Sequence, residues 1–154
     1  MIKPLIPVNE KERLINLKEY NILDTFPEEE YDAITQLASF ICKTPISLIT
    51  IIDENRQWFK SHHRTEITET PREYSFCAHA INDQDKIFIV PNSKHDERFH
   101  DNPFASVEPA GVFYAGVPLI SSEGFAWGTL CVIDKAPKIL ETEQIEALKI
   151  LSKQ

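Results

Sequence analysis

The spacing of apolar residues predicts two helices near the beginning of the chain. In residues 9–20 (NEKERLINLKEY), Asn9 and Glu12 have the spacing of a capping box, so a helix is expected to start there. In residues 25–41 (TFPEEEYDAITQLASFI), Thr25 is expected to cap a second helix, with Pro27 and the glutamates in its first turn. The apolar positions that share one face of this second helix are Ile34, Leu37, Ala38 and Ile41.

The middle and end of the chain favour strands. Residues 46–53 (ISLITIID) are rich in β-branched side chains and lead into DEN, a turn signal. Residues 56–62 (RQWFKSH) are therefore expected to be a hairpin partner, and residues 86–91 (KIFIVP) a short strand. Residues 112–121 (VFYAGVPLIS) and 125–134 (FAWGTLCVID) flank SEG and predict a long hairpin.

Three further segments complete the predicted order of elements. Residues 72–82 (REYSFCAHAIN) lack a period-two pattern and favour a short helix, whereas the polar residues 92–103 predict a loop or one helical turn. Residues 141–154 predict an amphipathic helix with Ile145, Leu148 and Leu151 in one stripe. Two hairpins indicate an antiparallel sheet with helices packed on it, so we expect one α+β domain over residues 1–154.

Composition and charge narrow the possible partners and the compartment. The 154 residues suit one core, and a net charge of −8 argues against sequence-independent nucleic-acid binding. Residues 56–64 (RQWFKSHHR) are locally basic, which leaves room for a positive pocket that holds a small anion. The three widely spaced cysteines, without a signal peptide or a long apolar run, favour reduced thiols in the cytoplasm and no membrane contact.

Five blocks of the sequence, in this order, resemble a bacterial GAF domain. They are residues 22–35 (ILDTFPEEEYDAIT), 53–61 (DENRQWFKS), 68–81 (TETPREYSFCAHAI), 113–121 (FYAGVPLIS) and 127–134 (WGTLCVID). The resemblance covers residues 23–151 and is greatest to GAF domains that precede diguanylate cyclase (GGDEF) or histidine kinase modules. It implies a six-stranded antiparallel sheet with helices on both faces. Residues 1–22 would hold an N-terminal helix, and residues 141–154 the start of a C-terminal signalling helix.

The resemblance also implies a ligand pocket on one face of the sheet, under residues 72–82 and 92–103. A cyclic nucleotide, cAMP or cGMP, is the expected ligand, and a linked diguanylate cyclase is the expected effector. Because Phe113 and Tyr114 alternate along a strand, only one of them can face this pocket. The residues expected to bind the ligand are Ser75, Phe76, Cys77, Ala78, His79, Asp96, Arg98, Phe99, Asn102, Phe113, Tyr114 and Thr129.

Cys77 and His79 leave other chemistries open. GAF-type free methionine sulfoxide reductases have a cysteine at a position like Cys77, but they need a resolving thiol, and residues 112–118 contain none. Bilin-binding relatives carry adjacent Cys-His, whereas Ala78 intervenes here, and two residues are too few for a zinc site. We therefore expect a non-enzymatic sensor without metal or cofactor, which dimerises through its terminal helices. The alternatives are a thiol-dependent free methionine sulfoxide reductase and a ligand-free dimerisation module.

Overall fold

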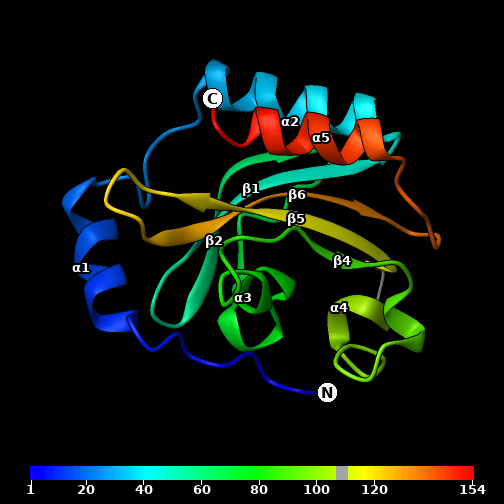
Figure 1. The fold of residues 1–154 in the computed structure, drawn as a ribbon, viewed down its shortest axis with the longest axis horizontal. Coiled ribbons are helices and arrows are strands. Elements are labelled where there is room, and N and C mark those ends of the chain that lie inside the picture. The colour runs from blue at the N-terminus through cyan, green and yellow to red at the C-terminus, as the bar shows by residue number, and fades with distance from the viewer. Residues whose placement is uncertain (107–110) are drawn as a thin grey trace.

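The computed structural model describes residues 1–106 and 111–154, and its centre is one antiparallel sheet (Figure 1). Within this described part, six strands lie in the order β3-β2-β1-β6-β5-β4. Their bounds are β1 Ile46–Ile52, β2 Arg56–His63, β3 Glu69–Pro71, β4 Phe88–Val90, β5 Phe113–Ile120 and β6 Ala126–Asp134. The α+β class and the six-stranded antiparallel sheet with helices on both faces are confirmed.

Helices cover the two faces of the sheet unequally. Long helices α2 (Glu29–Cys42) and α5 (Thr142–Leu151) lie side by side on one face, and the short helices α3 (Phe76–Ala80) and α4 (Pro103–Ser106) lie on the other side (Figure 1). The 3-10 helix η1 (Arg72–Tyr74) directly precedes α3, and η2 (Ser93–His95) lies between β4 and α4 in sequence. Helix α1 (Glu10–Glu19) lies at one end of the sheet, where Arg13 donates hydrogen bonds to the backbone oxygens of Ile52 and Ala126.

The register of the central strands decides which side chains meet on each face. Cys131 of β6 pairs with Leu48 of β1 on one side and with Gly116 of β5 on the other. Because side chains alternate along a strand, Cys131 points toward α3, whereas its neighbour Leu130 belongs to the cluster beneath α2 and α5. The sheet therefore separates two apolar cores, one under the long helices and one under the short helices.

Both helix starts near the beginning of the chain differ in detail from the predicted caps. Asn9 does precede α1, but its side chain makes no cap hydrogen bond. Helix α2 begins at Glu29, so Thr25 does not cap it. The Thr25 hydroxyl instead donates to the backbone oxygen of Ile22 and accepts a hydrogen bond from Lys60.

The apolar faces of α2 and α5 also need correction. In α2, the predicted Ala38 is buried and Ile34 packs against the same core, but Leu37 and Ile41 are 48% and 37% exposed. The other buried positions of this helix are Thr35, Ser39 and Cys42. In α5, Leu148 is completely buried, and Ile145 and Leu151 pack against the same core cluster. The predicted stripe of α5 therefore packs in the core of this domain, so it is not free to form the dimer contact expected of the terminal helices.

Candidate functional site

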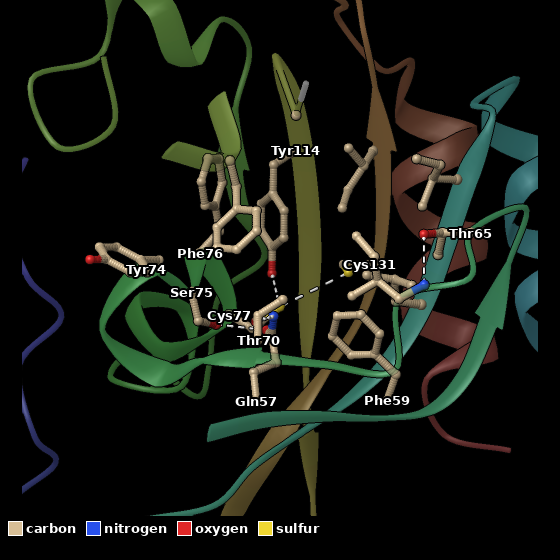
Figure 2. Close-up of a pocket in the computed structure, with 16 residues that line it drawn as sticks. Gln57, Phe59, Thr65, Thr70, Tyr74, Ser75, Phe76, Cys77, Tyr114 and Cys131 are labelled. Carbon is tan, nitrogen blue, oxygen red and sulfur yellow. Dashed lines mark hydrogen bonds between the residues drawn. The ribbon is translucent and has the colours of Figure 1, made fainter. Parts of the chain in front are cut away.

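A cavity of about 100 Å³ lies on the α3 side of the sheet (Figure 2). Strands β1, β2, β5 and β6 form its floor, and η1, α3 and the chain before β3 form its walls. It is lined by Ile46, Leu48, Gln57, Phe59, Thr65, Ile67, Thr70, Tyr74, Ser75, Phe76, Cys77, Phe104, Gly111, Tyr114, Cys131 and Ile133. Thr65, Ile67, Thr70 and Tyr74 are half-buried, so they mark the side of the cavity nearest to solvent.

The described lining residues contain no charged side chain. The basic residues of β2, which favoured a positive pocket, are neutralised elsewhere: Arg56 pairs with Asp24, and Lys60 pairs with Glu28. The expectation of a locally positive pocket in residues 56–64 is therefore wrong for this cavity. Charged ligands would lose hydration here without gaining an ionic partner from the described lining.

Polar groups on one wall already have partners. The Ser75 hydroxyl donates to Gln57 Oε1 at 2.6 Å and, as the N-cap of α3, accepts from the backbone N–H of Ala78 at 3.0 Å. Gln57 in turn donates to the hydroxyl of Thr70 at 3.0 Å. This chain of hydrogen bonds ties α3 to β2 and β3, so the wall of the cavity is fixed to the sheet.

Two thiols meet at the base of the cavity. The sulfur of Cys77, from α3, lies 4.0 Å from the sulfur of Cys131, from β6 (Figure 2). The hydroxyls of Tyr114 and Thr129 each donate a hydrogen bond to Cys77 Sγ at 3.0 Å. Gly116 makes room for this arrangement, because a Cβ atom there would lie 2.2 Å from the Tyr114 hydroxyl oxygen.

The surroundings of the two sulfurs shift their pKa values in opposite directions. Burial alone raises the pKa of the Cys77 thiol, but hydrogen bonds with Cys131, Thr129, Thr50 and Tyr114 outweigh it and lower the value to about 7. Burial, followed by the interaction with Cys77, raises the pKa of Cys131 well above its ordinary value. Cys77 is therefore the thiol that ionises first.

An aromatic stack forms the wall opposite β2. Phe76 lines the cavity and stacks on Phe99 with ring centroids 4.0 Å apart. Phe99 is 1% exposed and lies behind Phe76, so it anchors its loop and does not reach the cavity. Tyr114, which contacts Phe76 from β5, is the member of the Phe113–Tyr114 pair that faces the cavity, as alternation required.

The structure brings only four of the expected ligand residues to the cavity: Ser75, Phe76, Cys77 and Tyr114. Phe113 points into the opposite core beneath α2 and α5. Thr129 lies one layer behind, through its hydrogen bond to Cys77. Ala78 is buried in the apolar cluster on the α3 side of the sheet and does not line the cavity. Asn102 donates a hydrogen bond to the backbone oxygen of Tyr74 at 3.0 Å.

Arg98, Asp96 and His79 lie together on the far side of the aromatic stack. Arg98 holds Asp96 by two side-chain hydrogen bonds of 2.9 and 2.7 Å, and its guanidinium lies 4.8 Å from the ring centroid of Phe88. His79 points away from Cys77, with its ring centroid 4.9 Å from that of Phe99. Burial, then the nearby Arg98 charge, lower the pKa of His79. His79 and Arg98 border a separate hollow with Lys86 and Phe88.

Several lining residues were missed from the sequence, chiefly Gln57, Phe59, Tyr74 and Cys131. The strands that carry Gln57, Phe59 and Cys131 were predicted, but alternation alone does not say which face carries the pocket, and Tyr74 lies in η1, within a segment that was expected to cover the pocket. Cys131 needed the strand register as well, because only its pairing opposite Leu48 and Gly116 brings it under α3. All three cysteines are unpaired, as expected, and Cys42 is buried in the opposite core.

The described residues contain no cluster of three or more His, Cys, Asp or Glu side chains that could hold a metal ion. Across the same residues, none of the helices has the length and apolar character needed to span a bilayer.

The chain is similar in sequence to part of a characterised bacterial enzyme. A cyclic di-GMP phosphodiesterase from Pseudomonas aeruginosa is 40% identical over 138 residues, which are 90% of this chain but 23% of that protein. The chain thus spans about a quarter of the length of that relative.

Solved structures share the fold at low sequence identity. The GAF domain of an Acinetobacter phosphoenolpyruvate-protein phosphotransferase superposes with a TM-score of 0.63 at 15% identity, covering 92% of this chain and 87% of that one. A type II free methionine-R-sulfoxide reductase from Thermoplasma acidophilum gives 0.64 at 14% identity, covering 88% and 89%. The GAF domain family model matches residues 27–154. With the six-stranded sheet and its pocket, this match shows that the chain belongs to the GAF domain family.

Proposed function

We propose that this chain is a sensory domain that binds a small ligand between the sheet and α3 and thereby regulates an effector module joined to it. The observation that carries this proposal is the cavity, whose largely apolar walls and few converging polar groups are typical of small-molecule sites. Gln57, Ser75 and Tyr114 supply polar atoms at fixed positions. The effector's chemistry is assigned to a module outside these residues.

The proposed effector is an enzyme of cyclic di-GMP turnover. The supporting fact is the 40% identity to part of a cyclic di-GMP phosphodiesterase. A phosphodiesterase module is compatible with this, and so is the diguanylate cyclase expected from the sequence; a histidine kinase is the less supported choice. Activity of the full-length protein on cyclic di-GMP or GTP separates the three.

The lining favours a small, uncharged ligand. A volume of about 100 Å³ is below the roughly 300–1,000 Å³ of pockets that hold drug-sized ligands. The binding of a cyclic nucleotide, which the resemblance implies, remains a prediction, and it requires the structure to rearrange. Its phosphate would need a cationic partner, so Arg98 would have to leave Asp96 and the cavity would have to widen past Phe76.

Ligand binding is tested by native mass spectrometry of the purified domain and by thermal melting with cAMP and cGMP. A ligand at 100 times its Kd stabilises the fold by about 2.7 kcal/mol, which for a domain of this size raises Tm by roughly 5–10 °C. Flat melting curves and flat calorimetry with both nucleotides would remove that ligand class.

A blocking variant connects the cavity to regulation. Ile67→Trp places a large ring at the half-buried edge of the cavity and should abolish both ligand binding and the ligand's effect on full-length activity. Ile139→Trp, at a position 88% exposed, is the matched control and should change neither. If the two variants behave alike, the cavity is not the sensory site.

The contact between Cys77 and Cys131 raises a second candidate, reduction of free methionine sulfoxide. Cys131 supplies the second thiol that residues 112–118 lack. The uncharged described lining, however, offers no partner for the ammonium and carboxylate of a free amino acid. We therefore expect no turnover in an assay that couples thioredoxin to NADPH; robust turnover lost in Cys77→Ser would establish the reductase instead.

Dimerisation through helices remains part of the proposal, with different residues. Because the α5 stripe is buried, the proposed contact uses the large apolar side chains that α2 and α5 expose: Leu37, Phe40 and Ile41 of α2 and Ile150 of α5. These two helices lie side by side on one face (Figure 1). A dimer without any ligand would support the alternative of a pure dimerisation module.

A further inference from the structure

The proposed reversible ligand binding does not use the reactivity of the two thiols at the base of the cavity. Cys77 and Cys131 are 54 positions apart in sequence, yet their sulfurs lie 4.0 Å apart, and both side chains line the cavity. Cys42 lies in the core on the other face of the sheet, where burial raises the pKa of its thiol to about 11. The chain therefore contains one close pair and one isolated thiol that serves as an internal reference.

The hydrogen bonds around Cys77 suit an ionised sulfur. Tyr114 from β5 and Thr129 from β6 both donate to it at 3.0 Å. The titratable groups that face it are Tyr114 and Cys131, whereas His79 on the same helix points away toward Phe99. With a pKa of about 7, about half of Cys77 is thiolate near neutral pH, compared with about one part in ten thousand for Cys42.

The cavity beside the sulfurs is suited to a small, uncharged oxidant. The cavity volume of about 100 Å³ exceeds the roughly 10–15 Å³ that a single water needs, so a molecule of two oxygen atoms fits. Hydrogen peroxide is uncharged, so it can enter the neutral lining without the desolvation cost of an ion. The half-buried Thr65, Ile67 and Thr70 lie on the side of the cavity nearest to solvent, from which peroxide would enter.

We propose that Cys77 is a peroxide-reactive cysteine and that Cys131 resolves its oxidised form into a Cys77–Cys131 disulfide. The Cys77 thiolate attacks one oxygen of peroxide; the O–O bond breaks, an S–O bond forms, and hydroxide leaves. Cys131 then gives up its proton and attacks the sulfenic sulfur; the S–O bond breaks, the S–S bond forms, and the second hydroxide leaves. Two thiols are oxidised, and one peroxide is reduced to two waters.

The geometry requires only a local movement. A disulfide has sulfurs about 2.05 Å apart, so the two must approach by about 2 Å. Cys131 is held in a central strand paired on both sides, whereas Cys77 belongs to a helix of one turn. We therefore assign the movement to α3, whose N-cap Ser75 is tied to the sheet by the hydrogen bond to Gln57 and whose Cys77 is tied to it by the hydroxyls of Tyr114 and Thr129.

The test exposes the full chain to a small molar excess of hydrogen peroxide and follows intact mass and disulfide-linked peptides. The wild type and Cys42→Ser should each lose two hydrogens, form a Cys77–Cys131 peptide link and recover with dithiothreitol. Cys131→Ser should gain one oxygen that dimedone traps at Cys77, and Cys77→Ser should show neither change. Oxidation at Cys42 first, an unchanged rate in Cys77→Ser, or no reaction in the wild type would overturn the proposal.

A second variant keeps the test informative if a cysteine variant folds poorly. Tyr114→Phe removes one hydroxyl, so it should raise the pKa of Cys77 and move the midpoint of the oxidation rate against pH upward by about one unit. Its rate near neutral pH should fall about fivefold, because the thiolate fraction falls from about one half to about one tenth. An unmoved midpoint would show that the hydrogen bond does not control the thiol. Because the reaction is read as a mass change, its outcome is separate from that of the ligand experiments.

Discussion

Leu148 offers a direct test of how α5 sits on the domain. Its side chain is completely buried in the core cluster beneath α2 and α5, whereas Ile150, two positions further along, is 61% exposed. The two residues have nearly the same volume and lie on the same helix. Truncating each to alanine therefore changes burial while chemistry and helical context stay almost constant.

The expected magnitude follows from the burial. Leu-to-Ala changes at fully buried sites cost about 2–5 kcal/mol, from lost transfer energy and the cavity left behind. With about 3 kcal/mol for Leu148→Ala, the Tm of a domain of this size falls by about 6–12 °C. Ile150→Ala should stay within about 0.5 kcal/mol of the wild type, as exposed substitutions do.

Chemical denaturation of the reduced protein, followed by circular dichroism, measures both variants, and sedimentation shows whether either change alters association. Equal stability losses, or a larger loss for Ile150→Ala, would mean that α5 is rotated relative to this structure. A Leu148→Ala protein that is fully stable but monomeric, beside a dimeric wild type, would return the stripe to an intermolecular role.

Three further outcomes are expected. Gly128→Ala should strongly destabilise the fold, because its Cβ would lie 1.8 Å from the backbone oxygen of Thr50, and thermal melting measures this. Burial raises the pKa of Glu10, but hydrogen bonds led by Arg72 outweigh it and lower the pKa below 4.5. The stabilisation by ionised Glu10 is therefore complete above about pH 4.5 and is lost as the pH falls below that value. In a Glu10→Gln protein, the free energy of unfolding should depend less on pH in this acid range. Phe40→Asp, at a position 57% exposed, should weaken any self-association in sedimentation without lowering Tm.

The sequence pattern identified most of the elements, and the failures have physical causes. In α2, apolar spacing selected Leu37 and Ile41, but the buried side includes Thr35 and Ser39. Both polar side chains are satisfied, Thr35 by Ser61 and Ser39 by the backbone oxygen of Thr44. Burial of hydrogen-bonded polar groups costs little, and hydrophobic spacing cannot detect it.

The site was harder to predict because it depends on contacts between distant segments. Cys77 and Tyr114 were identified from their own neighbourhoods, but the thiol beside them comes from β6. The short strand β3 was missed too, since three residues carry no measurable alternation. Arg98 was assigned to the pocket because the family resemblance places its loop there and its charge suits a phosphate, and only the structure shows that Phe99 and Phe76 lie between it and the cavity.

The alternation along β6 has a consequence for how information could cross the domain. Cys131 faces the cavity, while its covalent neighbours Leu130 and Val132 pack in the same cluster as Leu148 of α5. The barrier between the two cores is therefore a single backbone, and no relay of side chains through the sheet is required. A displacement of the Cys131 sulfur would therefore be transmitted through the backbone of β6 to Leu130 and Val132, which pack beneath α2 and α5. No side chain would have to cross from one face of the sheet to the other.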